Sequence, residues 1–150
     1  MPPWWLIKID AAHQIQKNAT RMLSKLELVR KYWDHFDQAN FKAAATLMHE
    51  HAVVWEPNSR EVFRSRDAFI KTHEANPQPW RIEEIDILSE IKEGTIVTVV
   101  KAYSNTTPES YFITSFFNFA GEKIIEILEY WSKNGEAPTW RTNLNYAEKY

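Results

Sequence analysis

Two neighbouring stretches decide the fold: Tyr111-Phe112-Ile113-Thr114-Ser115-Phe116-Phe117-Asn118-Phe119 and Ile124-Ile125-Glu126-Ile127-Leu128-Glu129-Tyr130-Trp131. Both are rich in β-branched and aromatic residues, which is typical of strands. The short connection Ala120-Gly121-Glu122 between them indicates a hairpin. Apolar residues stand at both odd and even positions of each stretch, so both faces of this part of the sheet need cover.

Further elements extend from this hairpin toward the N-terminus. Two more strand-like runs precede it, Trp80 to Glu90 and Thr95 to Ser104. Before them, three helices and two short strands are predicted from apolar spacing and from the capping residues Asn40 and Asp67: helices over 23–36, 41–50 and 67–74, strands over 52–55 and 61–64. Helices followed by an antiparallel meander predict an α+β domain whose helices cover one face of the sheet.

The second sheet face requires a different cover, because three helices can shield only one. Another copy of the same sheet is the most economical cover, and the pattern therefore predicts a homodimer through the sheet face. The alternative is a strongly curved sheet that wraps on itself.

Composition excludes several classes of function. The 150 residues include no cysteine, which excludes disulfides and thiolate chemistry, and only three scattered glycines, which excludes a phosphate-binding loop. A net charge of −2 gives no footprint for nucleic acid or for an anionic membrane. The N-terminus carries no export signal, so we expect a cytoplasmic protein.

The chain is expected to hold a single domain over 23–150, with a C-terminal tail from about 133. Residues 1–22 differ in pattern and are expected to form a poorly packed leader, because the amphipathic periodicity begins only after them. Trp140 in the tail is unusual for a frayed end, and we expect it to pack back onto the domain, onto a dimer partner or into a cavity.

At this point the sequence resembles the nuclear transport factor 2-like superfamily, and within it the SnoaL-type polyketide cyclases and the ketosteroid isomerases. The resemblance rests on the helix-helix-strand spacing and on a last strand that reads I-x-E-I-x-E-Y-W over 124–131. It implies a cone-shaped α+β barrel, in which three N-terminal helices pack on a curved antiparallel sheet. The superfamily holds isomerases, cyclases, hydrolases and non-catalytic adaptors, so the fold alone does not name an activity.

Three catalytic candidates follow from the resemblance. In ketosteroid isomerases a first-helix Tyr donates to the enolate oxygen and a carboxylate before Pro moves the proton, and Tyr32 and Glu56 match these positions. Glu129 matches the carboxylate that the epoxide-hydrolase branch places in its pocket. The sequence departs from both patterns: Ser115 stands where isomerases place a protonated Asp, and 95–104 lacks the Arg and Asp of the hydrolases.

Structural roles compete with each candidate. Glu56 fits a turn residue that bonds the backbone after it or pairs with nearby Arg60. Glu129 fits one half of a salt bridge to an adjacent strand, and Tyr32 fits a core tyrosine with a satisfied hydroxyl. Aromatic and small polar residues of the same elements are expected to line a hydrophobic pocket: Trp33, Trp55, Ser115, Phe117 and Trp131.

No metal site and no cofactor are expected. On a helix, His49 and His51 would point about 200° apart, and they would share a face only if the strand had already begun; no third ligand accompanies them. Three functions remain open. The first is cofactor-independent acid-base chemistry on a small apolar carbonyl compound, of isomerase, cyclase or dehydratase type. The others are a small-molecule-binding protein without chemistry and a protein-association module.

Overall fold

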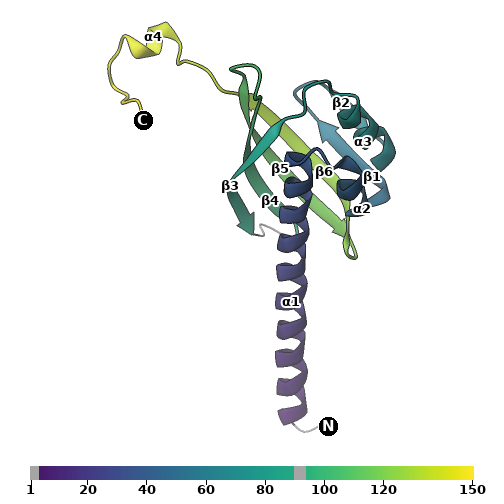
Figure 1. The fold of residues 1–150 in the computed structure, drawn as a ribbon. Coiled ribbons are helices and arrows are strands. Elements are labelled where there is room, and N and C mark those ends of the chain that lie inside the picture. The colour runs from purple at the N-terminus through teal and green to yellow at the C-terminus, as the bar shows by residue number, and fades with distance from the viewer. Residues whose placement is uncertain (1–3, 90–93) are drawn as a thin grey trace.

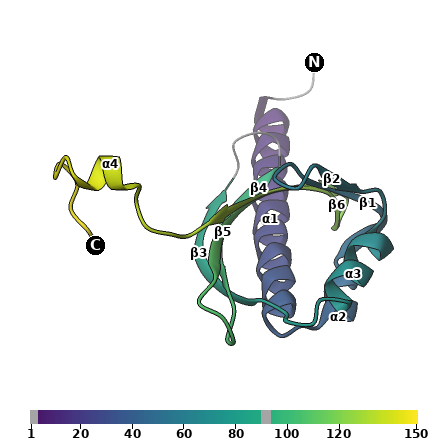
Figure 2. The same ribbon diagram turned by 90° about the horizontal axis from the view of Figure 1, so that it is seen from above.

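The computed structural model describes residues 4–89 and 94–150. It begins with one long helix, α1 (Trp4–Asp37), whose C-terminal half lies across the concave side of a curved sheet (Figures 1 and 2). The short helices α2 (Phe41–Thr46) and α3 (Arg66–Glu74) lie beside it. The tail after the last strand, with α4 (Thr139–Thr142), extends away from the sheet.

The sheet has six strands in the order β2-β1-β6-β5-β4-β3 and does not close into a barrel. The strands β3 (Arg81–Ser89), β4 (Ile96–Tyr103), β5 (Ser110–Ala120) and β6 (Lys123–Lys133) form the predicted antiparallel meander. β1 (Met48–Glu56) pairs with β6 in parallel and with the short β2 (Glu61–Phe63) in antiparallel. The α+β class with a curved sheet is thus confirmed, although the sheet contains one parallel pair.

The core fills the space between α1 and the concave face. Val29, Trp33 and Phe36 of α1 belong to one buried cluster with Ile113 and Phe117 of β5. Burial of such side chains stabilises each by roughly 1.5–3 kcal/mol. This cluster fixes how the last turns of α1 sit over the middle of the sheet.

A polar contact fixes the end of α1. Asp37 accepts hydrogen bonds from the backbone N–H of Ile82, at 2.7 Å, and from Arg81 Nε, at 2.9 Å. The hydrogen bond from Arg81 lowers the pKa of the Asp37 carboxyl. The C-terminus of α1 is therefore tied to the start of β3.

Several predicted boundaries were wrong. α1 begins at Trp4 rather than near Leu23, and the side chains of residues 11–19 are exposed. The second helix ends at Thr46 and not at Glu50, because Met48 already pairs with Ile124 of β6. Asn40 caps α2 as predicted, but α3 is capped by Ser65 and not by Asp67, since the Ser65 hydroxyl accepts from the backbone of Ala68.

A bulge also changes which side chains of β6 share a face. Asn118 pairs with Glu126 and Phe119 with Ile124, so Ile125 is an extra residue. Strict alternation along this strand would place Ile124 and Leu128 on one face and Ile127 on the other, whereas both Ile124 and Ile127 lie in the core.

The predicted packing of Trp140 onto the domain was also wrong, since this side chain is exposed on the projecting tail. Within residues 4–89 and 94–150, no helix combines the length and apolar character needed to cross a bilayer.

Candidate functional site

A row of polar residues crosses the middle of the concave face, one from each of four strands. Thr98 of β4 pairs with Ser115 of β5, and Ser115 pairs with Glu129 of β6. Trp55 pairs with Leu128 on the parallel strand β1, so Glu56 comes next to Glu129 when this register continues by one residue. Thr98, Ser115 and Glu129 are fully or almost fully buried.

Glu129 is the most unusual member of this row, because the residue is only 2% exposed and no cation of the described residues pairs with its carboxyl group. Ser115 Oγ donates to Oε1 at 3.3 Å, and Trp131 Nε1 donates to Oε2 at 3.4 Å. No ion pair among the described residues involves Glu129, so the predicted salt bridge is not formed. Burial and, secondarily, the nearby Glu56 raise the pKa of Glu129 to about 8, although the two hydrogen bonds act in the opposite direction. Glu129 is therefore mostly protonated at pH 7.

Glu56 lies at the end of β1 and is half-buried. Burial, followed by the charge of Glu61 opposite it on β2, raises the pKa of its carboxyl group. Two carboxyl groups on adjacent strands thus have different environments, and the more buried of the two holds its proton more strongly.

Tyr32 is completely buried, and its hydroxyl has no hydrogen-bond partner among the residues that the structure describes. Its ring packs against Phe36, with centroids 4.5 Å apart, and against Phe117, at 5.3 Å. Burial and then the charges of Glu129 and Glu56 raise its pKa, so the hydroxyl stays neutral. A buried, unpaired donor is costly, and this one lies within electrostatic range of both carboxyl groups.

A narrow cavity opens above Glu129. Its wall is mostly aromatic: Trp33, Phe36, Phe41, His73, Asn76, Pro79, Trp80, Ile82, Ile113, Glu129 and Trp131. Only about 20 Å³ is open to the centre of a water molecule, which is room for roughly one water. Burial lowers the pKa of His73 to about 4, so this ring is neutral and leaves Glu129 as the one ionisable group in the wall that can change charge near pH 7.

The predicted pocket residues fall into three places. Trp33 and Trp131 line the cavity together with Glu129. Ser115 and Phe117 lie beneath it, buried against Glu129 and Tyr32 respectively. Trp55 does not line it: alternation along β1 places Trp55 on the opposite face from Glu56, where it is 39% exposed and donates to Glu126.

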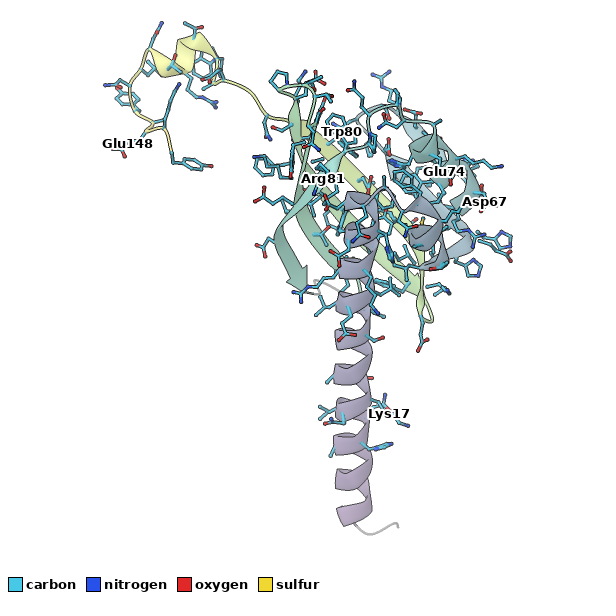
Figure 3. The ribbon with its side chains drawn as sticks, viewed as in Figure 1. Lys17, Asp67, Glu74, Trp80, Arg81 and Glu148 are labelled. Atoms are coloured by element: carbon cyan, nitrogen blue, oxygen red, sulfur yellow. The ribbon has the colours of Figure 1, made fainter. Side chains whose placement is uncertain are left out.

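Sequence reasoning missed the outer wall of the cavity. His73, at the end of α3, packs against the rings of Phe36 and Phe69 with centroids 4.9 and 4.6 Å away. Trp80 follows the Asn76-Pro77-Gln78-Pro79 turn, near Arg81 (Figure 3). The turn residues indicated a chain reversal, but no pattern in the sequence indicated that the chain would return over the concave face of the sheet.

The two histidines of the His49-Glu50-His51 stretch lie on β1 and not on a helix. Their rings are 5.5 Å apart, and His49 Nδ1 accepts from the backbone N–H of His51. The side chains described here contain no group of three that is suited to hold a metal ion.

The comparison with known families agrees with this architecture. A family model described as a SnoaL-like domain matches residues 29–127, about two thirds of the chain. This chain belongs to the SnoaL-like domain family. The predicted nuclear transport factor 2-like superfamily is thereby confirmed, and no curated protein matches the chain at a significant level.

Solved structures share the fold at low sequence identity. A candidate ketosteroid isomerase from Kribbella flavida is 17% identical, with a TM-score of 0.73, 86% of this chain covered and 91% of the other. An NTF2-like protein of unknown function from Burkholderia xenovorans has the same TM-score at 20% identity, over 87% and 98% of the two chains. An LEH-like epoxide hydrolase from M. tuberculosis has 9% identity and a TM-score of 0.63, over 74% of this chain and 84% of the other. At these identities the likeness establishes the fold alone.

The buried Glu129 of this SnoaL-like chain predicts a pH-dependent stability. The pKa of Glu129 is higher in the folded state than in the unfolded state. Its contribution to the free energy of unfolding is therefore fully present below about pH 4.5 and is lost as the pH rises through about 8. Glu129→Gln should remove this loss. Relative to the wild type, the variant should gain about 3 kcal/mol in free energy of unfolding between pH 5 and pH 8, as measured by urea denaturation.

Glu122→Gln, in the exposed β5–β6 turn, is the control for the loss of one carboxylate. Its free energy of unfolding should depend on pH in the same way as that of the wild type. Parallel profiles for Glu129→Gln and the wild type would show that Glu129 ionises normally in the folded protein.

Proposed function

We propose that this protein catalyses cofactor-independent proton transfer on a small apolar carbonyl compound, as an isomerase, cyclase or dehydratase does. The observation that carries the proposal is the carboxyl group of Glu129, buried in an aromatic-walled cavity without a cation and adjacent in register to a second carboxylate. Two carboxyl groups whose environments separate their pKa values can act as acid and base at the same pH.

The proposed roles follow from protonation. Glu56, less buried than Glu129 and at the strand end, is the base that removes a proton from the carbon next to the carbonyl group. The electron pair moves to the carbonyl oxygen, which becomes an enolate and accepts hydrogen bonds from the Tyr32 hydroxyl and protonated Glu129. Glu56 then returns the proton to the same carbon, which gives exchange, or, where the enolate is conjugated with a C=C bond, to the γ-carbon at the far end of that bond, which gives isomerisation; the proton count balances in both cases.

Ser115 and Trp131 are positioning residues in this scheme. Both hydrogen-bond to Glu129 from neighbouring positions, one oxygen each, and so fix the plane of the carboxyl group. Ser115 stands where isomerases of the superfamily have a protonated Asp, and here Glu129 on the paired strand supplies the neutral acid instead.

A second candidate function is supported by the small size of the cavity. A space of about 20 Å³ holds no carbonyl compound, and neither Glu56 nor Tyr32 lines it. The proposed chemistry therefore requires wall residues such as Trp80 or His73 to move aside. A module that binds another protein, or a binding protein that opens for an apolar ligand without reacting, needs no such chemistry.

The roles of the carboxyl groups predict the effect of Glu56→Gln. The variant should exchange the α-protons of small cyclic ketones for deuterium at least about 100-fold more slowly than the wild type, as followed by proton NMR in D₂O. The loss arises because an amide does not accept the proton, whereas the folded structure is kept.

Glu61→Gln is the matched control, since Glu61 pairs with Glu56 across the strands and is exposed. It should keep activity within a few-fold. Exchange at the wild-type rate by Glu56→Gln would exclude Glu56 as the base. If the wild type exchanged the α-protons of none of the small cyclic ketones tested, the binding or association functions would be favoured.

We also propose a homodimer through the convex sheet face. This face presents Trp55, Phe112 and Tyr130, which are 39%, 40% and 42% exposed, and an apolar patch of this kind typically marks an interface. Phe112→Asp should then raise the dimer dissociation constant at least about tenfold in sedimentation equilibrium, since it buries a charge in the contact. An unchanged dissociation constant would place any dimer contact elsewhere.

A further inference from the structure

Trp80 stands between two hollows of very different size. On one side lies the cavity above Glu129, with about 20 Å³ open to the centre of a water molecule. On the other side lies a groove with about 370 Å³ open in the same sense, lined by residues 37–39, 77–81 and 104–106. The groove thus runs between the end of α1, the turn before β3 and the β4–β5 loop, on the side where Trp80 adjoins Arg81 (Figure 3). Of the described residues, Trp80 and Pro79 line both hollows.

The two hollows have the size of a ligand site only when they are joined. Small-molecule pockets usually span about 300–1,000 Å³. The cavity is far smaller, and the groove, which has the volume, does not include Glu129 in its wall. A site that combines this volume with the buried carboxyl group therefore requires Trp80 to leave its place between them.

The Trp80 side chain has both weak fixation and room to move. It is held by ring contacts with Tyr111 and Trp131, whose centroids lie 5.3 and 6.3 Å away. The groove beside it can accept the indole ring. The backbone after it is fixed, because the N–H of Ile82 donates to Asp37 at 2.7 Å. Rotation of the side chain alone can therefore open the wall.

Two alternatives to Trp80 in the same wall are held more firmly. His73 packs against three rings, with centroids 4.9, 5.8 and 4.6 Å away: Phe36, Phe41 and Phe69. The Asn76 side chain accepts a hydrogen bond from the backbone N–H of Gln78 at 3.0 Å. Neither residue borders the groove, so Trp80 is the residue whose rotation joins the two hollows.

The groove is polar but carries no net charge. Arg81 and Asp37, its two charged residues, form an ion pair at 2.9 Å. The hydroxyl oxygens of Ser104 and Thr106 lie 3.1 Å apart, and with the amide of Gln78 they supply neutral donors and acceptors. An anion would meet Asp37 and a cation would meet Arg81. The groove therefore favours an uncharged group that carries hydroxyls.

We propose that Trp80 is the gate of the Glu129 cavity and that the groove behind it binds the far end of the substrate. The substrate is then an elongated carbonyl compound, with its carbonyl group beside Glu129 and an uncharged, hydroxylated end against Gln78 and Thr106. This inference rests on the function proposed above, because it assigns the second end of that substrate. While the gate is closed, the apparent affinity is reduced by the fraction of molecules that are open.

Removal of the indole ring tests the gate. In Trp80→Ala water reaches Glu129, so the pKa of Glu129 should fall from about 8 to below about 7 in carbon-13 NMR. The dissociation constant of 4-(2-hydroxyethyl)cyclohexanone should fall at least about threefold in ligand-observed NMR, because no closed state remains. Trp80→Phe keeps a ring against Tyr111 and should give smaller changes in the same direction. Trp140→Ala, the same substitution on the exposed tail, is the matched control and should change neither value.

A matched pair of ketones tests the groove. The wild type should bind 4-(2-hydroxyethyl)cyclohexanone at least about fivefold more tightly than 4-propylcyclohexanone, which has the same shape without the hydroxyl group. The double variant Gln78→Met and Thr106→Val should abolish this preference. Gln14→Met with Thr142→Val makes the same changes at exposed positions of α1 and α4 and should keep it.

The outcomes separate the gate from the chemistry. Binding with the expected preference but without α-proton exchange would support the gate and the groove and exclude the proposed chemistry. Exchange that depends on Glu56, with no effect of Trp80→Ala on the pKa of Glu129 or on ligand affinity, would overturn the gate and leave the chemistry intact. Equal binding of the two ketones, or binding of neither, would overturn the assignment of the groove.

Discussion

The site depends on one constraint: a carboxyl group that is buried without a cation. Removing a carboxylate from water costs several kcal/mol unless a charge or several hydrogen bonds compensate. Glu129 has two long hydrogen bonds, an acidic neighbour and aromatic walls. In this environment the protonated carboxyl group has a lower free energy than the carboxylate at neutral pH. A neutral acid in the interior is the consequence.

The rest of the fold creates that environment. The pairing of β6 with β5 on one side and β1 on the other sets Glu129 between Ser115 and Glu56, and α1 covers it with Tyr32 and Trp33. The tie between Asp37 and β3 holds the end of α1 over the sheet. A shift of one residue in the register of β6 would move Glu129 to the convex face, so strand register and function are coupled.

Much of this could be predicted from the sequence. The meander and the helical stripe around Val29 have strong local patterns, which is why the fold class was recognisable. The candidate acids Glu56 and Glu129 came from the resemblance to the superfamily and not from periodicity. The end of α2 and the bulge at Ile125 were not, because both are decided by pairing with a distant strand. His73 and Trp80 were missed for the same reason, since their place over the cavity comes from tertiary packing and no local pattern records it. The helix from Trp4 was missed because the apolar row of its first half, with Ala12, Ile15 and Ala19, is weak and rich in alanine.

Direct titration of Glu129 tests the account most closely. Carbon-13 NMR of the glutamate side-chain carboxyl groups, with Glu129 assigned through Glu129→Gln, reports its pKa in the folded protein. The account predicts a pKa of about 8 in the wild type and a lower one in Glu56→Gln, because the variant lacks the neighbouring charge. A value close to 4.5 in the wild type, or one that does not change in Glu56→Gln, would contradict the paired, buried carboxyl groups on which the proposed chemistry rests.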